Sequence, residues 1–242
     1  MQDLPSRWDR VGDRPVRRLV LGEARPGVPE LVLVPGLGAL GYLLPTARRC
    51  AATTRVHVLD LPGYGSPLTA GLPSGLSTVG DVLAGWLGTR PAPVVLAGHS
   101  TGAQLALLAA LVRPDRVAAL VAAGVTFPPD LRRPLPLLRR ALRTLRHEQP
   151  GELKAVLPQY LRGARRLPQL LATAMADAPE TRVPGLVVPL VVLRGRDDGL
   201  CPQDWAEHLA GRVPSGRVVV VPGAHNAPYT HAAEVAAVLT GC

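Results

Sequence analysis

The chain of 242 residues contains few aromatic side chains: they make up 3% of the sequence and include a single phenylalanine. Its core must therefore be packed from leucine, valine and alanine. Lysine is nearly absent too, since Lys154 is the only one and arginine carries almost all the positive charge. No basic stretch has the interleaved aromatics on which nucleic-acid bases stack. The net charge of +9 is thus a weak, charge-only signal, and we expect no nucleic-acid partner.

Cysteine and long apolar runs are also scarce. The three cysteines, Cys50, Cys201 and Cys242, include no closely spaced pair, which argues against a disulfide framework or a zinc site. No apolar run reaches the roughly 20 residues that cross a bilayer. The first residues show no basic segment followed by an apolar one, as a secretory signal would. We therefore expect a cytoplasmic protein without a membrane span or a metal.

The sequence does contain a regular alternation of short apolar runs and helical patterns. The runs predict strands over residues 17–21, 31–34, 56–59, 94–97, 117–125, 190–193 and 218–221. Helical patterns cover residues 79–87, 102–112 and 231–239. Such alternation is typical of βαβ units. It predicts an α/β fold with a mostly parallel central sheet and helices on both faces.

The alternation stops between Phe127 and Val187, where arginine, leucine and proline dominate and no strand-like run occurs. Leucines and arginines each recur there at helical spacing: Leu135, Leu138, Leu142 and Leu145, and Arg139, Arg140, Arg143 and Arg146. Structureless loops of this length are rare inside compact domains. We predict a helical lid over residues 128–186, inserted into a core domain formed by residues 1–127 and 187–242.

One motif carries specific chemistry. Gly98-His99-Ser100-Thr101-Gly102 matches G-x-S-x-G at a junction from a predicted strand to a predicted helix, the context in which this motif forms a nucleophile elbow. The sharp turn raises the serine hydroxyl above the sheet edge, and glycines two residues before and after let strand and helix pack closely. The alternative interpretation is an ordinary loop between a strand and a helix.

With this motif in this context, the sequence resembles the α/β-hydrolase superfamily from about Val16 to the C-terminus, apart from the lid. The resemblance implies an eight-stranded type of sheet, a nucleophile at Ser100, and catalytic residues in the order serine, acid, histidine. It also implies that no metal or organic cofactor is needed.

A serine hydroxyl needs a base to take its proton, and the sequence favours His225 among six histidines. His225 lies in Pro222-Gly223-Ala224-His225-Asn226, on a loop between the last predicted strand and the last predicted helix. That position is at the same sheet edge as Ser100. His99 should point away from the serine. The others, His57, His147, His208 and His231, lie within a predicted strand, the lid or predicted helices.

The histidine in turn needs an acid to fix its tautomer, and Asp197 and Asp198 both follow the penultimate strand. In the superfamily the acid commonly falls three residues after the glycine that ends this strand. This selects Asp198, while Asp197 would face solvent or pair with Arg196. The alternative for Asp198 is a turn or helix-capping aspartate.

Backbone N–H groups of Leu37 and Thr101 are the natural pair of donors for an oxyanion hole. Thr101 follows the nucleophile, and Leu37 lies in the glycine-rich loop after the second strand. This loop departs from the common pattern, because Pro35-Gly36 stands where many members have His-Gly. It lacks the lysine and the glycine spacing of a phosphate-binding loop.

These residues predict hydrolysis of a carboxylic ester, thioester or lactone through an acyl-enzyme on Ser100. Carbon–carbon bond hydrolysis and acyl transfer fit the same residues, and a non-catalytic ligand-binding member of the fold is the rival from another class. The expected partner is a small-molecule acyl substrate, apolar or anionic. On one hypothesis the lid leucines cover Ser100 and the lid arginines attract an anionic substrate. On the simpler one the arginines form a solvated basic face.

Overall fold

The computed structural model describes residues 5–62, 75–148, 151, 161 and 167–242. Its strands are β1 (Ser6–Val11), β2 (Arg14–Leu21), β3 (Leu31–Val34), β4 (Val56–Asp60), β5 (Val94–His99), β6 (Val117–Ala123), β7 (Leu190–Gly195) and β8 (Gly216–Val221). They form one eight-stranded sheet in the order β1-β2-β4-β3-β5-β6-β7-β8. β2 is antiparallel to both β1 and β4, and the other neighbours are parallel. The predicted α/β class with a mostly parallel sheet is confirmed.

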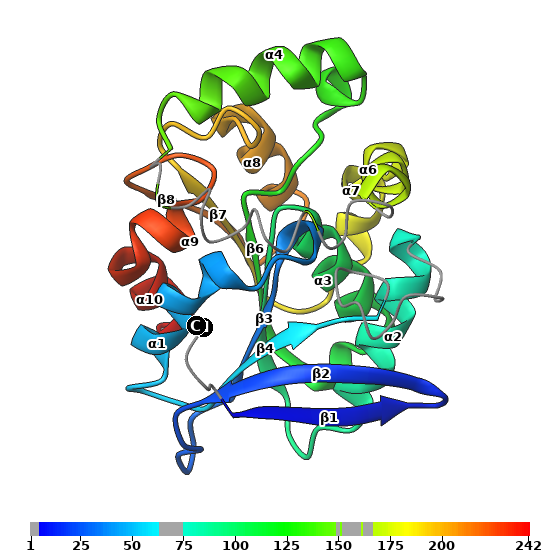
Figure 1. Ribbon diagram of the computed structural model, residues 1–242, viewed down its shortest axis with the longest axis vertical. Coiled ribbons are helices and arrows are strands. Elements are labelled where there is room, and N and C mark those ends of the chain that lie inside the picture. The colour runs from blue at the N-terminus through cyan, green and yellow to red at the C-terminus, as the bar shows by residue number, and fades with distance from the viewer. Residues whose placement is uncertain (1–4, 63–74, 149–150, 152–160, 162–166) are drawn as a thin grey trace.

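Helices cover both faces of this sheet. The α-helices are α1 (Leu44–Cys50), α2 (Leu76–Gly88), α3 (Thr101–Val112), α4 (Pro134–Leu145), α6 (Leu167–Ala176), α7 (Pro179–Arg182), α8 (Gln203–Ala210), α9 (Ala227–Thr230) and α10 (Ala232–Thr240). Short 3-10 turns lie at Gly36–Gly38, Gly41–Leu43, Pro114–Arg116, Pro129–Leu131 and Val183–Gly185. In Figure 1, α1, α9 and α10 lie on one side of the sheet and α2 and α3 on the other.

The core follows from the two-residue period of the strands. Val32 and Leu96 face the cluster that contains α2, α3 and α8, whereas the adjacent Leu33 and Ala97 face the cluster that contains α1 and α10. Since both faces are buried, the central strands are continuous apolar runs. This is why they could be predicted from the sequence.

Two differences from the prediction have local causes. β1 was not predicted, because this edge strand is only partly buried and reads Ser-Arg-Trp-Asp-Arg-Val, without an apolar run. The strand expected over residues 117–125 ends at Ala123, since Gly124 turns the backbone to a φ of +54°.

The predicted lid region is described only in part, because residues 149–150, 152–160 and 162–166 lie outside the described residues. No described residue between α4 and α6 belongs to a strand. The helix α4 lies at the outer edge of the molecule (Figure 1). Within the residues that the structure covers, no helix is long and apolar enough to span a bilayer.

Candidate active site

The backbone turns sharply at Ser100, between β5 and α3. Ser100 has φ 56° and ψ −126°, a conformation that L-residues rarely adopt. A Cβ on Gly98 would overlap the carbonyl of Gly102, and one on Gly102 would overlap the carbonyl of Val34. On the other side, a Cβ on Gly36 would lie 2.7 Å from the Ser100 Cβ. The glycines of G-x-S-x-G are therefore required sterically.

Ser100, His225 and Asp198 form a hydrogen-bonded line, although they are 27 to 125 residues apart in sequence. The Ser100 Oγ lies 3.0 Å from His225 Nε2, and His225 Nδ1 lies 3.0 Å from Asp198 Oδ2. Asp198 Oδ1 also accepts hydrogen bonds from the N–H groups of Leu200 (2.9 Å) and Cys201 (3.1 Å). These backbone donors fix the carboxylate in the orientation that faces His225.

The electrostatics of the pair favour a charged histidine beside a charged carboxylate. Burial by itself lowers the pKa of His225, but the charge of Asp198 and its hydrogen bond outweigh burial, so the pKa is raised above 6.5. For Asp198, burial raises the pKa, whereas the charge and hydrogen bond of His225 and the two backbone donors lower it below its ordinary value. The pair stabilises the imidazolium that forms when His225 takes a proton.

The neighbouring Asp197 has a different environment. Its side chain is exposed, and its N–H donates to the Gly223 carbonyl (2.9 Å). Asp198 is only 1% exposed. Of the two adjacent aspartates, only Asp198 is brought to His225.

Leu37 and Thr101, the expected oxyanion donors, lie beside Ser100 on the wall of the same pocket. Leu37 has a positive φ of 47°, and its N–H donates to the Thr101 hydroxyl at 2.9 Å. Thr101 is the first residue of α3, where backbone N–H groups and the helix dipole favour negative charge. The structure brings the two residues together beside Ser100.

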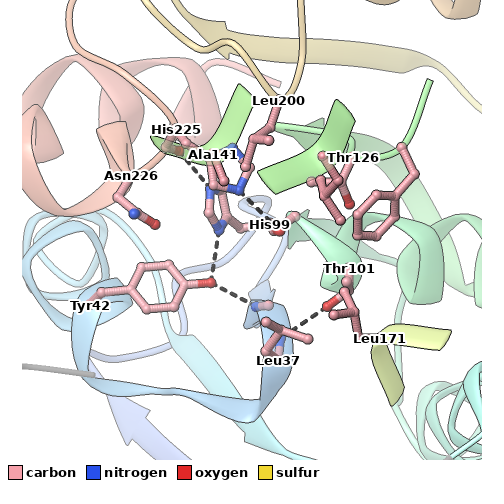
Figure 2. A pocket seen from close by; sticks show the side chains of 14 residues that line it. Leu37, Tyr42, His99, Thr101, Thr126, Ala141, Leu171, Leu200, His225 and Asn226 are labelled. Atoms are coloured by element: carbon pink, nitrogen blue, oxygen red, sulfur yellow. Dashed lines mark hydrogen bonds between the residues drawn. The ribbon is translucent and has the colours of Figure 1, made fainter. Parts of the chain in front are cut away.

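Tyr42 is a residue of this site that sequence reasoning missed. Its hydroxyl accepts a hydrogen bond from the Gly36 N–H (2.7 Å) and lies 2.8 Å from His99 Nδ1. His99 Nε2 in turn lies 2.8 Å from the carbonyl oxygen of His225. Figure 2 shows this line of side chains from Tyr42 through His99 to His225.

The protons in this line have only one consistent arrangement. Burial, aided by the charge of His225, lowers the pKa of His99 to about 3, so the ring is neutral. Because a carbonyl can only accept, His99 donates from Nε2 to His225, and the Tyr42 hydroxyl donates to Nδ1. The line joins the loop of Gly36 and Leu37 to the loop of His225. These hydrogen bonds support the loop in which Pro35-Gly36 replaces the common His-Gly pattern.

The other histidines lie elsewhere. They occupy strand β4 beside Glu30 (His57), the exposed end of α4 (His147), a stack on Trp205 in α8 (His208) and the turn after α9 (His231).

A pocket of about 230 Å³ opens beside Ser100. Its walls away from the hydrogen-bonded line are mostly apolar, formed by Phe127, Leu137, Ala141, Leu171 and Leu200, with Thr126 and Asn226 beside them. Among the described residues, no arginine, lysine, aspartate or glutamate lines it. The pocket therefore suits an uncharged, apolar group next to the serine.

The helix α4 covers this pocket with a different face from the one expected. One hypothesis from the sequence placed four leucines over Ser100, but all of them are exposed: Leu135, Leu138, Leu142 and Leu145. The residues that line the pocket are Leu137 and Ala141. The helix is turned this way because Thr144, on the same face, packs against the loop at Gly199, where a Cβ would lie 2.7 Å from the Thr144 hydroxyl.

Among the described residues, no group of three or more histidine, cysteine, aspartate or glutamate side chains could hold a metal ion.

The fold and this site together define a hydrolase of the α/β type: a mostly parallel sheet with a serine at the turn after β5 and a histidine beside it. The comparison with known families agrees, since the alpha/beta hydrolase family matches residues 31–238. The chain belongs to this family.

Proteins similar to this chain carry names that describe the hydrolysis of different kinds of bond. One is a pimeloyl-[acyl-carrier protein] methyl ester esterase of Aliivibrio salmonicida, 27% identical over 83% of this chain and 86% of its own length. RutD of Klebsiella pneumoniae, named provisionally as a carbamate hydrolase, is 28% identical over 86% of this chain and 88% of its own. Among solved structures, the proline iminopeptidase of Mycobacterium smegmatis has a TM-score of 0.78 with 17% identity, covering 97% of each chain. That last likeness concerns the fold alone.

The line through Tyr42 leads to a test of stability. Tyr42→Phe keeps the ring but leaves the buried Gly36 N–H and His99 Nδ1 without their partner. An unsatisfied buried polar group costs about 1–3 kcal/mol, so we expect the free energy of unfolding in urea to fall by about that much. Tyr229→Phe is the matched control, because the Tyr229 hydroxyl has no hydrogen bond within the described parts of the chain. Equal stability of the two variants would contradict the assignment.

Proposed function

We propose that the protein hydrolyses a carboxylic ester, thioester or lactone through an acyl-enzyme on Ser100. The observation that carries the proposal is the line from the Ser100 Oγ through His225 to Asp198, with both histidine nitrogens 3.0 Å from their partners. A nucleophile, a base and an orienting acid in this geometry activate a hydroxyl that is otherwise a weak nucleophile.

In the proposed mechanism, His225 Nε2 takes the proton of the Ser100 hydroxyl while Oγ attacks the substrate carbonyl. The N–H groups of Leu37 and Thr101 hold the negative oxygen of the tetrahedral intermediate. Leu37 would then direct its N–H to this oxygen, which competes with the Thr101 hydroxyl for it. His225 gives its proton to the leaving group, and the acyl group stays on Ser100. Water, deprotonated by His225, then releases the acid.

Asp198 stabilises the charged form of His225 in both half-reactions, as the pKa shifts of the pair support. The chemistry needs no group beyond these side chains and backbone donors. Acyl transfer would differ only in that another nucleophile replaces water in the second half-reaction.

The pocket supports a small apolar acyl group as the part bound next to Ser100. Its volume of about 230 Å³ is below the roughly 300 Å³ at which pockets for drug-sized ligands begin. The curated relatives named as methyl ester esterases act on an ester of an acyl chain, which favours ester hydrolysis here. We further propose that residues 128–186 form a cap, since Leu137, Ala141 and Leu171 from this segment close the pocket.

The first test concerns the nucleophile. Ser100→Ala removes the proposed nucleophilic oxygen, so we expect it to abolish both turnover and labelling by a fluorophosphonate. Ser77→Ala, in α2, is the control and should label stoichiometrically. Labelling of the Ser100→Ala protein at the wild-type level would show that another residue is the nucleophile.

The second test separates the adjacent aspartates. Asp198→Asn no longer enforces the histidine tautomer, and kcat should fall by about 10³- to 10⁴-fold. Asp197→Asn alters an exposed side chain, and its kcat should stay within about threefold of the wild-type value. Steady-state kinetics with one ester compare the two variants directly. The reverse ranking would refute the assignment of Asp198.

The third test follows from the raised pKa of His225. The histidine is a base only when neutral, so kcat/KM should rise with pH through an apparent pKa above 6.5, the ordinary histidine value. Without the carboxylate charge the imidazolium is less stable. This rising limb of the pH profile should therefore move to lower pH in Asp198→Asn. Rates of fluorophosphonate labelling measure this limb even in a slow variant. A limb that stays in place would contradict the proposed pairing.

A further inference from the structure

Among the described residues, the helix α4 buries one of its faces against the rest of the protein. Leu137, Ala141 and Thr144 are spaced by four and three residues and therefore share a face. The first two line the pocket, and Thr144 is buried. Two other stripes of α4 are exposed, and their composition is unusual for a solvated surface.

The next stripe along the helix is an exposed row of leucines. Leu135, Leu138, Leu142 and Leu145 are between 53% and 60% exposed. They extend over about 15 Å, at 1.5 Å per residue. Among the helices whose bounds are given above, no other exposes more than one large apolar side chain within the described residues. Single exposed leucines are ordinary, but a contiguous apolar patch marks a surface for interaction.

A stripe of arginines borders the leucines. Arg139, Arg143 and Arg146 again follow the spacing of four and three residues, and all three are exposed. None of them forms an ion pair with a described carboxylate. Three other arginines of the same segment do: Arg132 with Glu180, Arg140 with Asp130, and Arg182 with Asp177. The cations next to the leucines are thus the ones available to an external anion.

We propose that the leucine and arginine stripes of α4 dock on an anionic lipid surface. A helix that lies in a membrane interface has an apolar side rich in leucine and a basic side rich in arginine. The apolar stems of arginine cover the lipid boundary while the guanidinium groups reach the headgroups. α4 lies at the outer edge of the molecule with no labelled element beyond it (Figure 1). A flat surface can therefore contact its whole length, whereas a protein segment would bind more readily in a groove.

Docking would place the mouth of the pocket at the lipid surface, since Leu137 and Ala141 on the inner face of the same helix line that pocket. This inference rests on the proposed acyl hydrolysis and names its substrate class: an ester whose acyl chain is held in a lipid surface. The part of that acyl chain next to the ester would occupy the apolar pocket, whose volume is about 230 Å³.

The test measures co-sedimentation with vesicles at low salt. We expect the wild type to bind vesicles of phosphatidylcholine mixed equally with phosphatidylglycerol, and not vesicles of phosphatidylcholine alone. Arg139→Gln with Arg143→Gln should weaken partitioning about 30-fold, since each arginine near an anionic surface contributes about a factor of five. Leu138→Gln with Leu142→Gln should weaken it at least about tenfold. Glutamine forms helices well, so α4 should persist in both variants.

The matched control is Arg48→Gln with Arg49→Gln, two exposed arginines of α1. This variant makes the same change in net charge away from α4 and should bind vesicles like the wild type. An equal loss in the control would show that net charge, and not this face, attracts the lipid, and would overturn the proposal. Failure of the wild-type protein to bind the mixed vesicles would overturn the proposal as well. If the wild type is instead retained by an immobilised acidic protein, the face belongs to a protein partner.

Hydrolysis of a short water-soluble ester separates this proposal from the proposed function. All three double variants should hydrolyse it at the wild-type rate, because none of the altered residues lines the pocket. A wild type without such activity would refute the acyl hydrolysis while leaving vesicle binding measurable. Activity without vesicle binding would refute only the docking surface.

Discussion

The backbone conformation of Ser100 is the constraint from which the site is built. A left-handed φ at a residue other than glycine costs about 1–3 kcal/mol and persists only where the surroundings enforce it. Here β5 is paired on both sides, by β3 and β6, and the Ser100 N–H donates to the Ala123 carbonyl at 2.8 Å. The strain is thus held by the most buried part of the sheet. As a result, the hydroxyl projects from the turn towards His225.

The same close packing positions the groups around the serine. Because Gly36 lies against the Ser100 side chain, the loop that carries Leu37 lies close beside the serine. Gly124 does the same on the opposite side, where a Cβ would lie 3.1 Å from the His225 ring and 3.3 Å from Asp198. Tyr42 and His99 then join these loops through buried hydrogen bonds. The site is preorganised by loops that short contacts fix to a rigid sheet.

Much of this arrangement could be predicted from the sequence, because the signals are local. Strands buried on both faces are apolar runs, and the G-x-S-x-G motif is recognised from five consecutive residues. The position of His225 follows from the strand that precedes it, whereas the choice of Asp198 over Asp197 came from the resemblance to the superfamily. Tyr42 could not be predicted, since its partners lie 6 and 57 residues away and no spacing connects them.

The hypothesis about which face of α4 covers the pocket was wrong for a related reason. Helical spacing shows that Leu138, Leu142 and Leu145 share a face, but only packing decides which way the face is turned. In the structure Leu137 and Ala141 line the pocket and Thr144 is buried, while the four leucines are exposed. Residues 149–150, 152–160 and 162–166 lie outside the described part of the chain, so the predicted bounds of the lid remain a prediction.

The central claim is that an acyl group passes through Ser100. Rapid-quench mass spectrometry of the protein mixed with an activated ester tests this most directly, since a carboxylic acyl adduct of known mass can be located on a peptide. The account predicts one acyl group on the peptide that contains Ser100, formed and lost at rates that reproduce the turnover number. Steady turnover without any acylated Ser100, and with oxygen from labelled water entering the product before an adduct forms, would contradict it.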